Sequence, residues 1–111
     1  ELYLNSIRVK QLINDYKGAL DDYEKAIKLK PKDERLFNDR GIMKGKTGDY
    51  EGALADFNMA IALKPGLGSI YNNRAYVYLF LHQNEKACND FHKAMELGDY
   101  KEKENIKKYC K

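Results

Sequence analysis

The eighteen residues at positions 14–31, NDYKGALDDYEKAIKLKP, recur almost unchanged 34 residues later in the chain. The second copy, GDYEGALADFNMAIALKP at 48–65, is identical to the first at 11 of the 18 aligned positions. A weaker third copy, HQNEKACNDFHKAMELGD at 82–99, follows after another 34 residues. A constant period of this length is typical of proteins built from stacked structural repeats.

Each copy has the periodicity of an amphipathic helix. The apolar stripe of the second copy follows i, i+3, i+4, i+7 spacing and consists of Tyr50, Ala53, Leu54, Phe57, Ala60, Ile61 and Leu63. The segment at 34–46 shows a similar pattern. Between the two, Gly48 can end a helix in the left-handed conformation and Asp49 can cap the next one, which Pro65 then stops. One repeat is therefore predicted to be two antiparallel helices joined by a tight turn.

The small and aromatic residues of this unit resemble the tetratricopeptide repeat. That family has an aromatic and then Gly or Ala on the first helix. Its second helix carries aromatics alternating with Ala and ends at Pro. The matching positions are Tyr3, Phe37, Tyr71, Gly41, Ala75, Tyr16, Tyr50, Ala19, Ala53, Ala87, Tyr23, Phe57, Phe91, Ala26, Ala60, Ala94, Pro31 and Pro65. The chain departs from the pattern at Ile7, Asn84 and Asp99.

The resemblance implies an all-α fold, an α-α superhelix (solenoid) of three helix-turn-helix repeats plus a C-terminal capping helix. Residues 1–111 then form a single domain, with repeats at about 1–33, 34–67 and 68–99 and a cap at 100–111. The helices are expected near 1–13, 16–29, 34–46, 50–63, 69–81, 84–97 and 100–110. Asp99 and Glu102 have the spacing of a capping box, which predicts that the last helix begins at Tyr100.

Charge and hydropathy argue against two classes of partner. The net charge of +3 comes from the end of the chain, because residues 100–111 hold five lysines against two glutamates. Nucleic-acid binding usually needs a basic face instead, so no nucleic acid is expected. The longest apolar run, AYVYLFL at 75–81, is far shorter than the roughly 20 residues of a membrane helix, so no membrane insertion is expected.

The amino-terminal end lacks the polar cap that repeat arrays need. The chain begins at Glu1 without a methionine, which favours a removed leader or an upstream region. Self-association at this end is the other interpretation.

No catalytic set is found in the sequence. His82 and His92 are ten residues apart, with no cysteine or carboxylate at zinc-ligand spacing. No glycine-rich phosphate loop follows a strand. The prediction is a protein that is not an enzyme and has no cofactor and no metal site.

The remaining candidate site is a surface. In tetratricopeptide stacks the first helices line a concave face, and the residues expected there are Leu4, Asn5, Arg8, Asn38, Asp39, Ile42, Lys46, Ser69, Asn72, Asn73, Tyr76 and Phe80. Asn amides can pair with both the donors and the acceptors of an extended peptide, and the two aromatics add apolar area. The alternative is an ordinary solvated face, with Phe80 packed inward.

These residues favour a non-enzymatic protein- or peptide-binding scaffold that uses the concave face. The alternative is a structural or self-assembling segment of a longer solenoid. Some family members bind a terminal carboxylate with Lys, Asn and Arg on their first helices. The corresponding slots hold Leu4, Arg8, Asp39, Ser69 and Asn73. Because Asp39 would repel a carboxylate, this clamp is not expected.

Two sets of residues recur at the 34-residue period and suggest ties between repeats. They are Asp22, Asp56 and Asp90, and Arg40, Arg74 and Lys108. Packing of one repeat's second helix on the next first helix predicts the pairs Asp22–Arg40, Asp56–Arg74 and Asp90–Lys108.

The two cysteines are expected to approach each other. The same register brings Cys88, on the last repeat, close to Cys110 in the capping helix. A disulfide would then pin the final helix and indicate a periplasmic or secreted protein. The alternative is two reduced thiols in a cytoplasmic protein, with Cys88 packed as a small apolar group.

Overall fold

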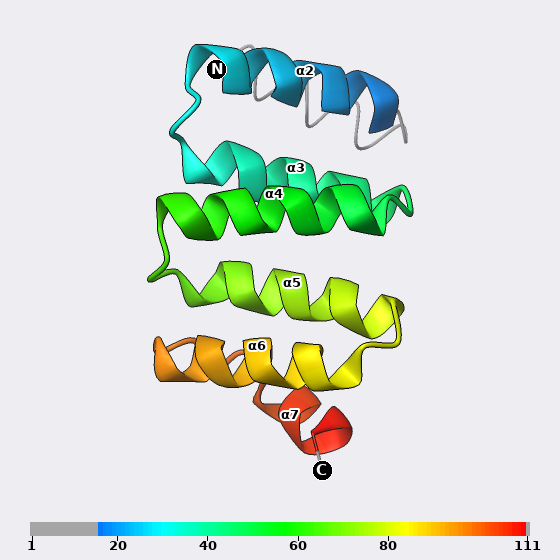
Figure 1. Ribbon diagram of the computed structural model, residues 1–111, viewed down its shortest axis with the longest axis vertical. Coiled ribbons are helices and arrows are strands. Elements are labelled where there is room, and N and C mark those ends of the chain that lie inside the picture. Colours follow the sequence, from blue (N-terminus) through cyan, green and yellow to red (C-terminus); the bar gives the residue numbers. More distant parts are fainter. Residues whose placement is uncertain (1–15, 111) are drawn as a thin grey trace.

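The computed structural model describes residues 16–110, which form helices and no strand. The helices are α2 (Tyr16–Leu29), α3 (Glu34–Lys46), α4 (Tyr50–Leu63), α5 (Gly68–Phe80), α6 (Asn84–Glu96) and α7 (Lys103–Tyr109). They stack in chain order from α2 at one end to α7 at the other (Figure 1). The predicted helical solenoid is therefore confirmed, while the helix expected at 1–13 lies outside the described residues.

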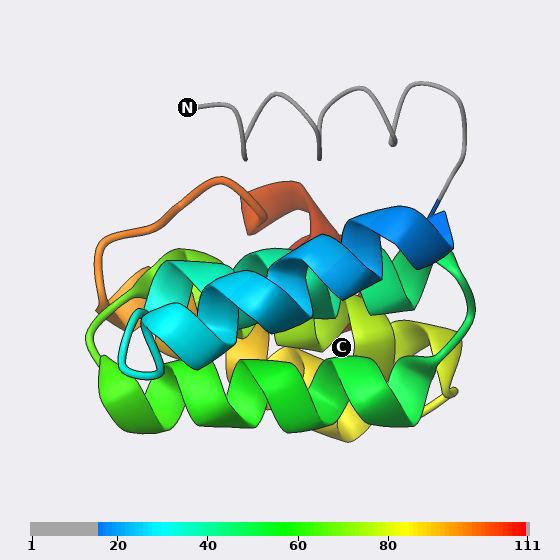
Figure 2. The same ribbon diagram turned by 90° about the horizontal axis from the view of Figure 1, so that it is seen from above.

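The apolar stripes meet in clusters between successive helices. One cluster joins α3, α4 and α5, and its buried members are Phe37, Ala53, Phe57, Ala60, Ile70 and Val77. A second lies between α2 and α3, and a third between α5 and α6. Figure 2 looks along this stack from the α2 end. Each helix pair thus buries its apolar face against a neighbouring pair, as in other repeat proteins.

The turns follow the chemistry expected from the sequence. Gly48 has φ of 87° and follows α3, and the Asp49 side chain accepts a hydrogen bond from the Gly52 N–H at 3.0 Å. His82 occupies the equivalent turn of the next repeat and also has a positive φ, of 59°. Helix α4 ends at Leu63, two residues before Pro65.

The capping box predicted at the last helix is wrong. Helix α7 begins at Lys103, and its first turn has no side-chain cap. The Asp99 carboxylate instead accepts a hydrogen bond from the Lys101 N–H at 3.1 Å, which forms a local turn. The Glu102 carboxylate accepts hydrogen bonds from the Tyr76 hydroxyl and from the side-chain amide of Asn105. Since both acids have other partners, the helix starts three residues later than Tyr100.

The predicted ion pairs between repeats are also wrong. The Arg40 guanidinium donates two hydrogen bonds to Asp56, at 2.7 and 2.8 Å. Arg74 donates to Asp90 with the same two distances. The pairs therefore join the two helices of one repeat, because the tight turn sets a residue on the first helix opposite one sixteen positions later. Lys108 lies over the ring of Tyr109 instead, 5.2 Å from its centroid.

Candidate functional site

A pocket of about 390 Å³ opens between α3 and α5. Five of the residues predicted for the concave face line it: Ile42, Lys46, Asn73, Tyr76 and Phe80. The other lining residues are two glycines of α3, two aromatic residues of α4 and one valine of α5: Gly41, Gly45, Tyr50, Phe57 and Val77. The structure therefore gathers residues from two neighbouring repeats around one largely apolar hollow.

Two glycines of α3 have opposite roles in this pocket. A Cβ added to Gly41 would lie 2.8 Å from Cε1 of Phe57, so Gly41 lets the buried ring pass beneath the helix. A Cβ added to Gly45 would meet no atom within 4 Å, because it would point into open space. Gly41 is thus required for packing, whereas Gly45 keeps the pocket wide.

These two positions give a matched pair of substitutions. Gly41→Ala is expected to lower the free energy of unfolding by about 1–3 kcal/mol, the usual cost of overpacking a core. Gly45→Ala is expected to raise it by about 0.5–1 kcal/mol, because alanine is the better helix former. Urea unfolding of both variants measures the two changes. A similar loss of stability in both would contradict the assigned roles.

The aromatic wall of the pocket is partly exposed. Phe80 is 62% exposed, and its ring stacks on that of Tyr50 with centroids 5.4 Å apart. The Tyr76 ring meets Phe91 edge to face at 5.7 Å, and its hydroxyl bonds to Glu102 and Asn105 of the C-terminal segment. Burial, and then the bond to Glu102, raises the pKa of Tyr76 to about 12. Phe80 does not pack fully inward, so apolar area is open to a ligand.

The predicted asparagines differ in accessibility. The Asn73 side-chain amide donates a hydrogen bond to the side-chain oxygen Oδ1 of Asn38 at 3.0 Å, which links α3 to α5. Asn72, by contrast, is only 3% exposed, and neither polar atom of its amide has a partner among the described residues. The expectation that Asn72 presents its amide to the open groove is therefore not met. A buried amide without partners costs about 1–3 kcal/mol.

The remaining predicted positions lie at the edges of the site or beyond the described part of the chain. Ser69 is exposed, and Asp39 is half-buried on α3. Leu4, Asn5 and Arg8 lie outside the described residues. Burial raises the pKa of the Asp39 carboxyl, while Arg35 lowers it and Asp33 raises it. Burial and the charge of Asp39 also raise the pKa of Tyr23 to about 12.

The raised pKa of Asp39 predicts a pH dependence. In the folded chain the Asp39 carboxyl keeps its proton to a higher pH than its ordinary pKa of 3.8. Ionisation of Asp39 therefore lowers the free energy of unfolding as the pH rises through and past 3.8. Asp39→Asn is expected to raise the free energy of unfolding at pH 7 by about 0.5 kcal/mol, the scale of a partly exposed substitution. At pH 3 the difference is expected to vanish. Denaturant unfolding at both values tests this, and a variant that is less stable at pH 7 would refute it.

Other kinds of site find no support in residues 16–110. No group of three or more His, Cys, Asp or Glu residues there is arranged to hold a metal ion. No helix in the same range is both long and apolar enough to cross a bilayer. The two cysteines approach each other as expected, and of the two alternatives the structure has the bridged one, a Cys88–Cys110 disulfide with Cα atoms 5.6 Å apart.

Comparison with known proteins assigns the repeat. The sequence model described as Tetratricopeptide repeat matches residues 8–33 and 68–97. The chain belongs to the tetratricopeptide repeat family. A search of curated protein sequences found no match.

Several solved tetratricopeptide structures share this arrangement. The first TPR of Spaghetti (RPAP3), bound to the HSP90 peptide SRMEEVD, superposes with a TM-score of 0.87 at 21% identity over 97% of this chain and 87% of that one. The TPR2B domain of yeast Sti1, in a complex with pHsp70, gives 0.80 at 20% identity over 98% and 94%. MamA gives 0.79 at 22% identity over 96% and 60%. At these identities the likeness establishes the fold.

Proposed function

We propose that this chain is a non-enzymatic binding module that holds an extended segment of another protein along its concave face. The pocket between α3 and α5 carries the proposal. Its volume of about 390 Å³ falls within the roughly 300–1,000 Å³ of ligand sites in proteins. Aromatic walls with few polar groups suit one large apolar side chain of the partner, which would act as its anchor.

The polar residues beside the pocket suit a peptide backbone. The bond between Asn73 and Asn38 uses one donor of the first amide and one acceptor site of the second. Each amide therefore retains further donor and acceptor capacity for a ligand. Lys46, which is exposed at the mouth, adds a cation. The combination favours an apolar anchor flanked by ordinary peptide groups.

The solved relatives support the general function. Two of them are complexes, one with an HSP90 peptide and one with pHsp70. The acidic end of the HSP90 peptide is a poor guide to the ligand of this chain, because the carboxylate-clamp slot on α3 holds Asp39. We therefore assign an apolar anchor and not a terminal carboxylate as the main recognition element.

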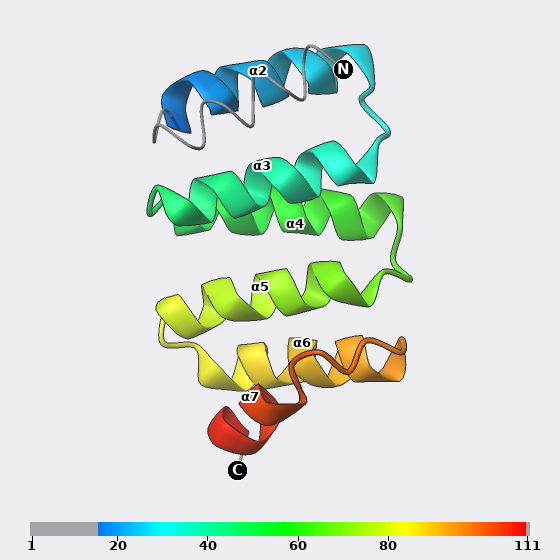
Figure 3. The ribbon, with the colours of Figure 1, turned by 180° about the vertical axis from the view of Figure 1, so that it is seen from behind.

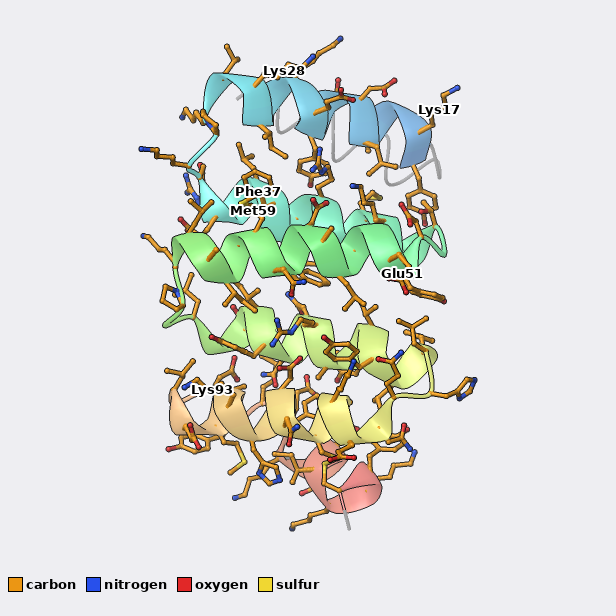
Figure 4. All side chains as sticks on the ribbon, viewed as in Figure 1. Lys17, Lys28, Phe37, Glu51, Met59 and Lys93 are labelled. Carbon is orange, nitrogen blue, oxygen red and sulfur yellow. A yellow bond between two sulfur atoms is a disulfide. The ribbon has the colours of Figure 1, made fainter. Side chains whose placement is uncertain are left out.

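Exposed apolar residues away from the pocket favour a second candidate, self-assembly within a longer array. Leu29 is 77% exposed and Met59, on α4, is 46% exposed (Figure 4). Sedimentation velocity across a range of concentrations separates the two functions. A dimer that Leu29→Ser abolishes would support self-assembly. A monomer at all concentrations would reject self-assembly and favour the binding module.

Selection from a displayed library of random peptides tests the proposal. We expect the selected peptides to share a large apolar residue and to lose at least about tenfold in affinity for Gly45→Leu, about the value of a buried leucine-sized contact. Leucine at position 45 fills the pocket without a backbone clash.

Lys93→Leu is the matched control, because it adds the same side chain at an exposed position on α6 (Figure 4). It is expected to bind like the original chain. Peptides that bind Gly45→Leu unchanged would refute the pocket as the site.

A further inference from the structure

The C-terminal segment covers one face of α5. Gly68, Asn72 and Tyr76 follow each other at intervals of four, so they lie in line on one side of the helix. At one end, a Cβ on Gly68 would lie 2.9 Å from Cβ of Asp99. At the other end, the Tyr76 hydroxyl is hydrogen-bonded to Glu102 and Asn105. Residues 99–105 therefore run along this line, on the side of the molecule that faces the viewer in Figure 3.

The residue in the middle of the covered face is Asn72. It is 3% exposed, and its amide nitrogen and oxygen have no partner among residues 16–110. Buried amides are nearly always hydrogen-bonded, so an amide without a partner calls for an explanation. One donor and one acceptor side by side match the N–H and C=O of an extended peptide. The face is continuous with the pocket, since Tyr76 belongs to both.

The covering segment has few attachments of its own. Helix α7 has seven residues, none of them buried, and no side-chain cap. Isolated helices of this length are unstable in water. Ile106 is half-buried against the α5–α6 cluster, and the Cys88–Cys110 disulfide ties the far end to α6. Both cysteines are partly exposed, so a small thiol can reach them.

We propose that residues 99–110 form a lid over a second part of the peptide groove, latched by the Cys88–Cys110 disulfide. A dithiol reductant opens the latch. One of its thiolates attacks a protein sulfur to give a mixed disulfide, and its second thiol then closes to a cyclic disulfide. Two electrons and two protons pass to the protein, which is left with two thiols. The lid then leaves α5, and Asn72 binds the backbone of the segment that the pocket anchors.

Hydrogen exchange of the full chain tests the latch without any ligand. The oxidised chain is compared with the chain in dithiothreitol and with the variant Cys88→Ser/Cys110→Ser. We expect the amides of residues 103–109 to exchange at least about tenfold faster after reduction and in the variant, as for a locally unfolding segment. Amides of α3 and α4 are followed in the same experiment, because they report the loss of global stability that removal of the disulfide also causes. Unchanged exchange in residues 103–109 would overturn the proposal.

Two probes test the groove. That the groove binds a peptide rests on the proposed function. N-acetyltryptophanamide fills only the pocket. An acetylated, amidated peptide with one tryptophan between two tetraglycine arms adds backbone on both sides of the same side chain. We expect the peptide to bind the reduced chain and the double variant about tenfold more tightly than the oxidised chain, as for one or two added hydrogen bonds. N-acetyltryptophanamide is expected to bind all forms equally.

Asn72→Ala distinguishes the source of the gain. In the double variant it is expected to return the peptide to the affinity of the oxidised chain, while in the oxidised chain it is expected to change nothing. Equal or weaker peptide binding after reduction would overturn the lid and leave the pocket standing. If neither probe binds any form, the proposed pocket function fails, and hydrogen exchange still decides whether the latch exists.

Discussion

Asp56→Ala is expected to lower the free energy of unfolding by about 3–5 kcal/mol, the cost of breaking a buried ion pair. Asp56 is 3% exposed and receives two hydrogen bonds from Arg40, and the Lys44 ammonium lies 3.3 Å away. The bonds to Asp56 raise the pKa of Arg40, which is held in its charged form. Removing the carboxylate therefore leaves two cations between α3 and α4 without their partner. Thermal and urea unfolding measure the loss.

Two further variants separate charge from packing. Glu96→Ala breaks an exposed pair with Lys93, so it is expected to cost less than about 1 kcal/mol. Arg40→Met combined with Asp56→Leu removes both members of the Arg40–Asp56 pair and leaves only Lys44 without its partner, so it is expected to recover part of the stability. If Asp56→Ala costs no more than Glu96→Ala, the buried pair does not stabilise the repeat.

Loss of the Cys88–Cys110 disulfide is expected to lower the free energy of unfolding by about 3 kcal/mol in the chain-entropy model. The bond closes a loop between residues 22 positions apart. Without it the unfolded chain gains conformations that the cross-link had forbidden. Urea unfolding of the oxidised chain and of Cys88→Ser/Cys110→Ser measures the difference, with dithiothreitol as an independent route to the same state.

The two routes control each other. The double variant is expected to show no further change in dithiothreitol, because it has no disulfide to reduce. Mass spectrometry under non-reducing conditions, after alkylation, reports the fraction bridged before each measurement. Equal stability of the fully bridged chain and the variant would contradict the contribution assigned to the bond.

The sequence predicts the repeat well because its signals are local. Periodicity, Gly48, Asp49 and Pro65 together place α3 and α4 at the bounds that the structure shows. The start of α7 is missed, because it depends on a contact with a residue that is distant in the sequence. Glu102 binds Tyr76 on α5, and no pattern within residues 99–111 signals that contact.

The ion pairs show a different limit. Aspartates and arginines that recur every 34 residues satisfy two pairings equally: aspartate with the arginine 18 residues ahead, or arginine with the aspartate 16 residues ahead. The period cannot choose between them. The tight turn does, since it aligns Arg40 with Asp56 and Arg74 with Asp90. Arg74 does reach the neighbouring repeat, but its partner there is Asn58, at 2.8 Å.

The candidate site was predicted in outline. Spacing on the first helices finds Ile42, Asn73 and Phe80, which share the pocket. It misses Gly45, although that glycine lies four residues after Gly41 on a helical face and so marks a gap. Tyr50 is missed because it belongs to a second helix and reaches the pocket from its first turn. Asn72 is buried although its spacing predicts an exposed amide, and in the lid proposed above it is covered by the C-terminal segment, whose position the repeat pattern does not specify.

A map of amide chemical shifts tests the central claim most directly. The isotope-labelled oxidised chain is titrated with the strongest peptide from the displayed library, and the shifts are assigned residue by residue. We predict the largest changes at Ile42, Gly45 and Asn73, with Lys93 unmoved. Changes confined to the outer surface of α4 and α6, with none at the pocket, would contradict the account.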